Sequence, residues 1–380
     1  MPELLTESER HALFPVTREW AYLDNARRGA ISMPAAAFAM HYVEGLRDGG
    51  VTAWPEWQEV WDSGNAGFAR YIGADVDEIQ FLVNATESFA RVTLGIDWKP
   101  GDHAVVWARD YPGLVRPVLD LKRKGVEVSL VPDRADHSRP VQDALDAITE
   151  KTRLVAASWV DFRTGWKIDA KSLAAACRER GVLSHIDAVQ AVGAMSIDMH
   201  DIGCDFATFA IRKYLCGLDT LGVLYVRRES LQHLQPHTLG LFSVENPFDF
   251  EKIEQPLAAG SKRFALGTPS MVQVYSLKAA LELHARFDAD MVFARVNEIA
   301  GETMRLAREA GYKAFADDWD AAHYSQIVVL KREGKLADEK LQDRLQAAKV
   351  AASARQGILR IAPHWYNSRA DLQRLFDVLA

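Results

Sequence analysis

Short runs of apolar, β-branched residues alternate with amphipathic stretches between about residues 80 and 230 of the chain. This alternation is typical of strand-helix-strand units that build a mostly parallel sheet. The predicted strands span residues 103–108, 126–131, 153–159, 182–186, 206–211 and 221–226. Helical patterns lie between them, among them 115–124 and 170–180. The chain is therefore predicted to adopt an α/β fold with a three-layer αβα core, in which helices cover both faces of the sheet.

The pattern changes after about residue 270, where two long helical stretches, 271–287 and 293–310, precede a shorter tail that bears strands. A chain of 380 residues also exceeds what one hydrophobic core usually supports. We therefore predict an N-terminal segment (1–20), a large domain (21–260) and a smaller α+β C-terminal domain (261–380).

The charge of the chain limits its partners. A net charge of −7 and a pI near 5.9 leave no basic surplus for binding a nucleic-acid backbone. No run of 18 apolar residues occurs, and the first ten residues are polar and acidic, so neither a membrane span nor a secretion signal is expected. The expected location is the cytoplasm.

The cysteine content supports the same location. The chain contains three cysteines, Cys177, Cys204 and Cys216, and none of them forms a C-x-x-C pair. An odd number of widely spaced cysteines argues against a disulfide framework and against a zinc site. No metal is expected, and the three thiols are interpreted as small buried side chains.

The most informative residues are an aspartate and a lysine that end two predicted strands. Asp187 closes the strand that carries His185, and Lys213 follows 26 positions later at the end of the next strand. Ligands of open α/β sheets bind beyond the carboxyl ends of the strands. Pyridoxal 5'-phosphate (PLP) chemistry requires a carboxylate that keeps the pyridine nitrogen protonated and a lysine that forms a Schiff base and moves the α-proton. The pair therefore predicts PLP chemistry on an amino acid.

Further motifs accompany this pair in a fixed order. They are Tyr22-Leu-Asp-Asn25, Asn84-Ala-Thr86-Glu-Ser88, His185-Ile-Asp187-Ala-Val-Gln190, Ile211-Arg212-Lys213-Tyr214, Gly267-Thr268-Pro269 and Leu359-Arg360-Ile-Ala-Pro-His-Trp-Tyr-Asn367. Together they resemble the aminotransferase class V group, which includes cysteine desulfurases, selenocysteine lyases, kynureninases and isopenicillin N epimerase. The resemblance implies a fold-type I PLP-dependent transferase with PLP as its cofactor.

The resemblance also implies roles for individual cofactor-binding residues. Asp187 would pair with the pyridine nitrogen, Gln190 would contact the ring hydroxyl, and Lys213 would form the Schiff base. Ala85 and Thr86 open a predicted helix whose backbone N–H groups and threonine hydroxyl suit a phosphate. Tyr111 would stack on the cofactor ring.

Other assignments concern the phosphate and the subunit boundary. Arg212 stands where the family more often has histidine or tyrosine, so it either adds charge for the phosphate or alters access to Lys213. Gly267 and Thr268 resemble the element that donates a threonine hydroxyl to the phosphate of the other subunit. The resemblance therefore implies a homodimer.

The substrate carboxylate needs a cationic partner, and a guanidinium fits its two oxygens better than an ammonium does. By resemblance Arg360 is that partner, and Arg355 is a second candidate. Asn25 and Arg28 are expected to line the entrance.

Two departures from the family bear on the reaction. No cysteine occurs between Arg355 and Arg360, where desulfurases of the group carry a mobile catalytic cysteine, so a persulfide-forming desulfurase is disfavoured. The segment from Gly217 to Gly222 replaces the usual Gly-Pro-rich turn, which predicts a less tightly turned loop and an altered substrate pocket.

The leading hypothesis is an enzyme that removes the α-proton of an amino acid with Lys213. We rank β-elimination first, including carbon-sulfur cleavage without a persulfide cysteine, by analogy with the subgroup. Epimerisation or racemisation and transamination are alternatives. A further alternative of another class is a catalytically degraded, PLP-binding interaction protein.

Overall fold

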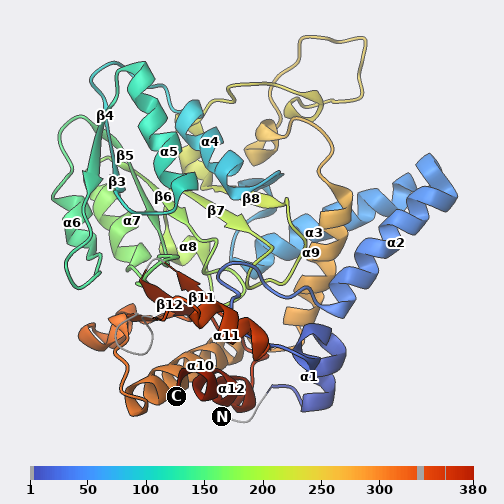
Figure 1. The fold of residues 1–380 in the computed structure, drawn as a ribbon. Coiled ribbons are helices and arrows are strands. Elements are labelled where there is room, and N and C mark those ends of the chain that lie inside the picture. Colours follow the sequence, from blue (N-terminus) through green and yellow to red (C-terminus); the bar gives the residue numbers. More distant parts are fainter. Residues whose placement is uncertain (1–3, 332–337, 356) are drawn as a thin grey trace.

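The structure is a computed structural model that describes residues 4–331, 338–355 and 357–380. Its central sheet has seven strands in the order β2-β8-β7-β6-β5-β3-β4 (Figure 1). β8 runs antiparallel to both β7 and β2, and the other neighbouring strands are parallel. The strands are β2 (Ile79–Leu82), β3 (His103–Trp107), β4 (Glu127–Val131), β5 (Thr152–Ser158), β6 (Leu183–Asp187), β7 (Phe206–Ala210) and β8 (Gly222–Val226).

Helices cover both faces of this sheet. Alternate residues of β3 face opposite sides: Val105 packs in one buried cluster and Val106 in another. The first cluster includes side chains of α3 (Trp54–Tyr71), α7 (Ala170–Glu179) and α8 (Met199–Ile202), and the second includes those of α4 (Ala85–Gly95) and α5 (Pro112–Asp120). The predicted α/β fold with a three-layer core is therefore confirmed.

The C-terminal part of the chain lies beside the carboxyl ends of the parallel strands (Figure 1). Its antiparallel sheet has the order β11-β12-β9, and β10 pairs in parallel with β1 near the N-terminus. The strands are β1 (Ala21–Tyr22), β9 (Val328–Lys331), β10 (Val350–Ala351), β11 (Ser353–Arg355) and β12 (Ile358–Ile361). The helices are α10 (Ala289–Glu309), α11 (Leu341–Ala347) and α12 (Arg369–Leu379).

The N-terminal residues pack against this C-terminal part. Arg10 of α1 (Glu7–Leu13) forms a buried ion pair of 2.9 Å with Asp371 of α12. The remaining helices are α2 (Met33–Gly49), α6 (Val141–Leu145) and α9 (Met271–His284). α9 packs against α2 and α3, whereas α10 packs against α12 and β9. The predicted domain boundaries near residues 20 and 260 remain a prediction.

The elements expected from the pattern are present, with small shifts at their ends. All six predicted strands occur within one or two residues of their predicted bounds. The predicted helix 115–124 begins earlier, because Pro112 suits the first helical turn, and its last turn is a 3₁₀-helix that ends at Gly125 (φ 78°). Within the described residues, no helix combines the length and apolarity that a membrane crossing needs.

Candidate active site

A cavity of about 650 Å³ opens beyond the carboxyl ends of the parallel strands, where the topology of an open α/β sheet places ligands. It lies between the central sheet, the start of α4 and the turn before α5. Eight of the predicted site residues or their direct neighbours line it: Asn84, Ala85, Thr86, Tyr111, Asp187, Gln190, Arg212 and Lys213. The site predicted from scattered motifs is therefore one connected space.

Asp187 ends β6, Lys213 lies in the turn after the neighbouring parallel strand β7, and both residues line this cavity. Burial raises the pKa of the Asp187 carboxyl to about 6, although the backbone N–H of Val189 donates to it at 2.9 Å. Burial likewise lowers the pKa of the Lys213 ammonium to about 7, although Asp187 stabilises its charge. The structure gives the Lys213 amine no hydrogen-bond or ion-pair partner among the residues it describes, and its Nζ lies 5.7 Å from the centroid of the Tyr111 ring.

The lowered pKa of Lys213 makes a prediction that needs no cofactor. Because the neutral amine is the nucleophile, acetylation of Lys213 in the cofactor-free protein is expected to rise as the pH passes through about 7. A lysine in a short model peptide, labelled in parallel, should become reactive about three pH units higher. Competitive labelling with acetic anhydride and peptide mass spectrometry measures both. Equal midpoints for the two lysines would show that Lys213 is not perturbed.

The first turn of α4 forms another wall of the cavity. Asn84 caps this helix by accepting a hydrogen bond from the Glu87 backbone at 2.9 Å, so the helix begins at Ala85. The backbone N–H groups of the first turn have no partners within the helix, and they carry its positive dipole end. A methyl group on Gly113 would meet the Thr86 hydroxyl at 2.3 Å, so glycine there keeps the space beside Thr86 open. This turn has the properties of an anion site.

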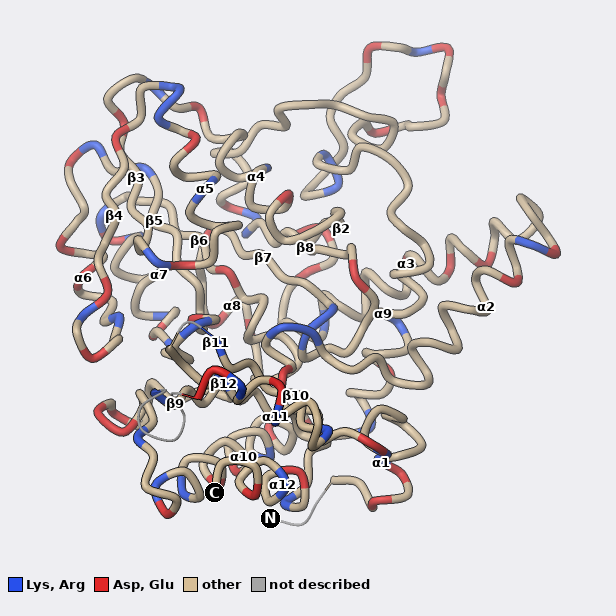
Figure 2. Tube along the Cα trace, in the orientation of Figure 1, with Lys and Arg blue, Asp and Glu red and all other residues tan. Residues whose placement is uncertain are grey.

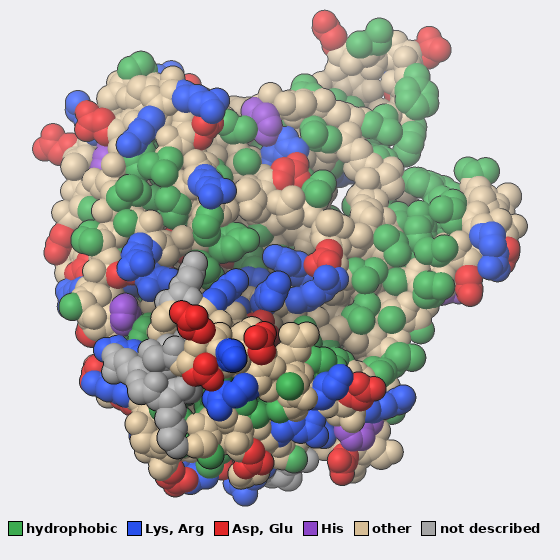
Figure 3. Space-filling view, in the orientation of Figure 1, with side chains coloured by type: hydrophobic (Ala, Val, Ile, Leu, Met, Phe, Trp, Pro, Cys, Tyr) green, Lys and Arg blue, Asp and Glu red, His purple; other side chains and the backbone are tan. Residues whose placement is uncertain are grey.

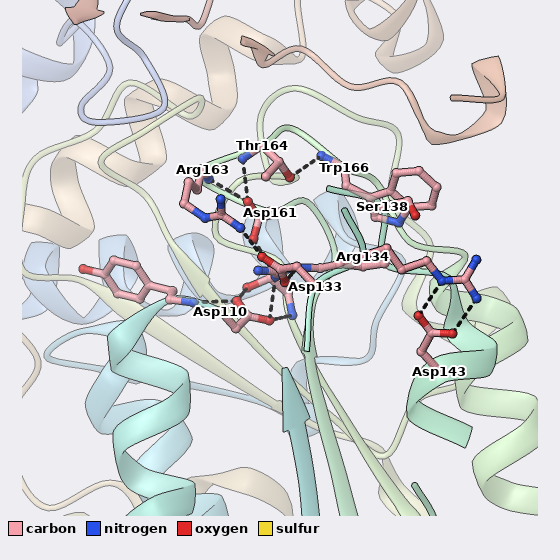
Figure 4. A network of polar contacts seen from close by, with 12 residues as sticks. Asp110, Asp133, Arg134, Ser138, Asp143, Asp161, Arg163, Thr164 and Trp166 are labelled. Atoms are coloured by element: carbon pink, nitrogen blue, oxygen red, sulfur yellow. Dashed lines mark hydrogen bonds and ion pairs between the residues drawn. The ribbon is translucent and has the colours of Figure 1, made fainter. Parts of the chain in front are cut away.

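A buried ionic network supports the opposite wall, and Figure 4 shows the carboxylates of Asp110, Asp133 and Asp161 converging beyond the strand ends. Arg139 lies among them, with ion pairs of 2.8 Å to Asp133, 2.5 Å to Asp161 and 3.6 Å to Asp110. All four side chains are 5% exposed or less. The network joins the loops that follow β3, β4 and β5.

This network also fixes residues that line the cavity. Asp110 accepts hydrogen bonds from the backbone and the hydroxyl of Ser158 at 3.0 and 2.5 Å, and it directly precedes Tyr111. The Tyr111 ring meets the ring of Phe162 edge to face, with 5.4 Å between their centroids. Burial raises the pKa of Asp110, and the charge of Asp110 in turn raises the pKa of Asp187.

The Arg360 guanidinium is already hydrogen-bonded to other groups of the chain. It is 4% exposed, and its guanidinium donates to the Phe162 carbonyl at 2.8 Å and to Asp24 at 3.0 Å. Burial raises the pKa of Asp24, and Arg360 opposes this rise most strongly. Phe162 lines the cavity, whereas Arg360 lies behind it. A substrate carboxylate that binds Arg360 must therefore share it with Asp24.

The expected position of Asn25 at the entrance is wrong. Asn25 is fully buried, and its amide donates to the Ala362 carbonyl at 2.9 Å and accepts from the Tyr366 hydroxyl at 2.8 Å. These bonds connect the segment after β1 to the segment after β12. The neighbouring Arg28 is exposed and pairs with Asp219, which does line the cavity.

The other predicted residues lie at the rim or farther away. Arg212 lines the cavity and lies 3.8 Å from Asp219, and Arg355 is exposed on β11. Thr268 is exposed and lines a separate cavity of about 220 Å³ with Gly267, so it does not reach the site of its own chain. The loop from Gly217 to Gly222 carries Thr220 with φ 65°, a left-handed conformation that is strained for threonine.

Sequence reasoning missed three residues of the site: Asp24, Asp110 and Asp219. The sequence signal for Asp24 was its place in the Tyr22-Leu-Asp-Asn25 motif, of which only Asn25 was predicted to be a site residue. Asp110 directly precedes the predicted Tyr111. Asp219 lies in a loop that no pattern positions.

The comparisons with known proteins agree with this geometry. The family model described as aminotransferase class V matches residues 40–375. An uncharacterized aminotransferase, YcbU of Bacillus subtilis, is 27% identical over 381 aligned positions, which cover 100% of this chain and 98% of the relative. A probable cysteine desulfurase of Pyrococcus abyssi is 26% identical over 285 positions, covering 73% of this chain and 70% of that protein. The chain belongs to the aminotransferase class V family.

Solved structures share the fold at low sequence identity. The apo structure of a cysteine desulfurase from Thermococcus onnurineus has a TM-score of 0.88 at 20% identity, covering 100% of this chain and 98% of that one. The cystine C-S lyase C-DES, in complex with its product cysteine persulfide, has a TM-score of 0.87 at 20% identity, covering 96% and 99%. The predicted fold-type I architecture is therefore confirmed.

PLP is the cofactor of the class V family, as the sequence predicted, and the cavity fits this group. Lys213 offers an amine without a hydrogen-bond partner among the described residues. Asp187 offers a buried carboxyl, and the Gln190 amide oxygen is buried without a partner in the cavity wall. The α4 turn offers N–H groups to a phosphate. The donor types that the cofactor needs are present in one space.

Proposed function

We propose that this protein is a PLP-dependent enzyme that acts on an α-amino acid in the cavity around Lys213. The observation that carries the proposal is the position of Asp187 and Lys213 at the carboxyl ends of adjacent parallel strands, Asp187 as the last residue of β6 and Lys213 in the turn after β7, where both line one cavity. A buried acid beside a buried amine of lowered pKa is costly to keep unless the pair has a function, and such perturbed pairs mark functional sites.

Bound PLP supplies an electron-accepting ring that acidifies the α-proton of an amino acid. In our proposal Asp187 would hold a proton on the pyridine nitrogen through its negative charge, and Gln190 would contact the ring hydroxyl. Lys213 would hold the cofactor covalently, and its amine, whose pKa near 7 suits a base at neutral pH, would take the α-proton. Tyr111 would lie against the ring.

The phosphate would lie against the first turn of α4. Ala85 and Thr86 would donate backbone N–H groups and a hydroxyl to it, and Arg212 at the cavity rim would add a positive charge. We further propose that the chain acts as a homodimer in which Thr268 donates to the phosphate of the other subunit. The exposure of Thr268, and its absence from the residues that line the cavity of its own chain, support this arrangement.

The reaction that we propose first is β-elimination, with carbon-sulfur cleavage that does not pass through an enzyme persulfide. The likeness to the C-S lyase C-DES supports it at the level of the fold. The thiols support it more directly, because all three cysteines are buried, and burial raises the pKa of Cys177 to about 12 and that of the other two further. None is an accessible thiolate at neutral pH.

A panel of amino acids tests this proposal. The holo-protein is incubated with L-cystine, L-cysteine and non-sulfur amino acids, and products are identified by mass spectrometry. β-Elimination predicts pyruvate and released sulfur species, with no cysteine peptide gaining a sulfur atom. An epimerised substrate would instead indicate epimerisation. A keto acid that keeps the carbon chain of the substrate would indicate transamination. A protein that binds PLP and transforms no member of the panel would favour an interaction protein.

Replacement of Arg360 by alanine is expected to retain PLP and to weaken amino-acid binding by about 2 to 5 kcal/mol, because the carboxylate loses its guanidinium partner. The same change leaves Asp24 buried beside no close ion-pair partner, so the free energy of unfolding should fall by about 3 kcal/mol or more. Spectral titration and denaturant unfolding measure the two effects.

A second variant separates the two effects. Adding Asp24→Asn to Arg360→Ala removes the orphaned charge, so it should recover much of the lost stability without recovering amino-acid affinity. If the affinity for amino acids returns together with the free energy of unfolding, Arg360 stabilises the fold and does not bind the substrate.

A further inference from the structure

Arginine side chains are concentrated at the mouth of the cavity. Figure 3 shows Lys and Arg gathered in a band across the middle of the molecule, between the central sheet and the C-terminal part, and Figure 2 shows that separate chain segments contribute to it. Three chain segments that line the cavity or bond to its lining residues carry arginines. These arginines are Arg27, Arg28, Arg212, Arg355 and Arg360.

The segment with Arg27 and Arg28 is fixed to the cavity wall. The Ala26 carbonyl accepts a hydrogen bond of 3.1 Å from the side chain of Gln190, and the Gly29 N–H donates to the Arg212 carbonyl at 2.9 Å. Gln190 and Arg212 both line the cavity. The segment between these two bonds therefore crosses the edge of the site.

Few carboxylates balance these arginines. Arg28 and Arg212 share Asp219. Arg360 pairs with Asp24, and Arg27 and Arg355 are near enough to Asp24 to lower its pKa. Neither Arg27 nor Arg355 has an ion-pair partner among the residues that the structure describes. In these three segments and their ion pairs, five guanidinium groups are thus matched by two carboxylates, an excess of three positive charges.

The proposed cofactor and an amino acid with a neutral side chain would not neutralise this excess of positive charge. The PLP phosphate would engage Arg212 and the first turn of α4, and the α-carboxylate of any amino acid would engage Arg360. Arg27, Arg28 and Arg355 then remain with Asp219 and the shared Asp24. The buried carboxylates of Asp110, Asp133 and Asp161 lie on another wall, where they pair with Arg139 and Arg163.

We infer that the substrate carries a second anionic group, so that the enzyme selects amino acids with an acidic side chain, with Arg27, Arg28 and Arg355 as the residues that select it. This inference rests on the proposed function and deepens it. A carboxylate, sulfinate or phosphate on the side chain would meet these three guanidinium groups, whose planar donors suit all three anions. A neutral side chain of the same size would leave them uncompensated.

Matched ligand pairs test the inference in the wild-type holo-protein. The probes are L-aspartate against L-asparagine, L-glutamate against L-glutamine, and O-phospho-L-serine against L-serine, followed through the visible absorbance of the bound cofactor. At least one acidic member is expected to bind about 10- to 100-fold more tightly than its neutral partner, as for charge-assisted hydrogen bonds. The pair with the largest ratio distinguishes a carboxylate from a phosphate. Ratios near one in all pairs would overturn the inference.

Variants that remove positive charge test which arginines select the acidic side chain. The double variant Arg27→Gln with Arg355→Gln, and separately Arg28→Gln, should lower the acidic-to-neutral ratio at least about fivefold while the affinity for the neutral ligand changes little. Arg305→Gln is the matched control, because Arg305 is an exposed arginine on α10 that pairs with Glu302 and Glu309. An equal loss in the control would show a general effect of protein charge rather than a local one.

A cofactor-independent measurement separates this inference from the proposed function. Calorimetry with succinate and the half-amide succinamate, on apo protein, is expected to show tighter binding of the dicarboxylate, weakened by the same double variant. A protein that shows no cofactor absorbance but still prefers succinate would refute the proposed function and still support the anion site. A normal cofactor absorbance without any preference would refute the inference alone.

Discussion

The variant Lys213→Ala is expected to lose the visible absorbance of covalently held PLP and to turn over amino acids at least about 10³-fold more slowly. The side chain is 5% exposed and lines the cavity, and its amine has no hydrogen-bond partner among the described residues. Alanine removes both the amine that joins the cofactor and the base that takes the α-proton. Absorbance spectra and single-turnover rates measure the two losses.

A control separates this effect from a change in net charge. Lys171→Ala removes an exposed lysine that pairs with Asp201 and does not line the cavity, and it should leave the absorbance and the rate unchanged. The assignment of Lys213 would be refuted by a variant that keeps full turnover. Unfolding of the variant is not expected, because the replaced ammonium is already costly to bury, as its lowered pKa shows.

The second large effect is expected for Asp187→Asn. This variant should keep bound PLP but lower turnover about 10²- to 10⁴-fold, because an amide carries no negative charge to hold the proton on the pyridine nitrogen. The asparagine is nearly the same size and still accepts a hydrogen bond from the Val189 backbone, so the pocket should keep its shape. Cofactor retention and turnover are measured on the same preparation.

A matched variant and a measurement of α-proton exchange complete this test. Asp201→Asn, in an exposed ion pair with Lys171, should have no effect on turnover. The role proposed for Asp187 requires the loss to fall on every step that removes the α-proton, so exchange of the α-proton with solvent should slow as much as turnover does. Wild-type exchange in the Asp187 variant would rule the role out.

Much of this site was predictable because its strongest signals are local in sequence. Asp187 ends one apolar strand and Lys213 follows the end of the next, and parallel neighbouring strands bring their carboxyl ends to one edge, so the pattern alone places the two residues together. The turn at Asn84 follows from helix capping in the same way. The alternation of apolar runs likewise predicted all six strands within one or two residues.

The contacts that sequence reasoning missed join distant parts of the chain. Asp24 and Arg360 are 336 positions apart, and nothing near either residue indicates that the guanidinium is already paired. Asn25 was misplaced for the same reason, since its partners at positions 362 and 366 become neighbours only after β12 packs beside the N-terminal segment. The Arg139 network also forms only when three loops converge.

The central claim is that the cofactor is joined to Lys213 beside Asp187. Reduction of the PLP-loaded protein with borohydride, followed by peptide mapping, locates the attachment directly, because reduction makes the bond to the lysine permanent. The account predicts a single pyridoxyl modification, on the peptide that contains Lys213. A modification on any other lysine, or none in a protein that retains PLP, would contradict it.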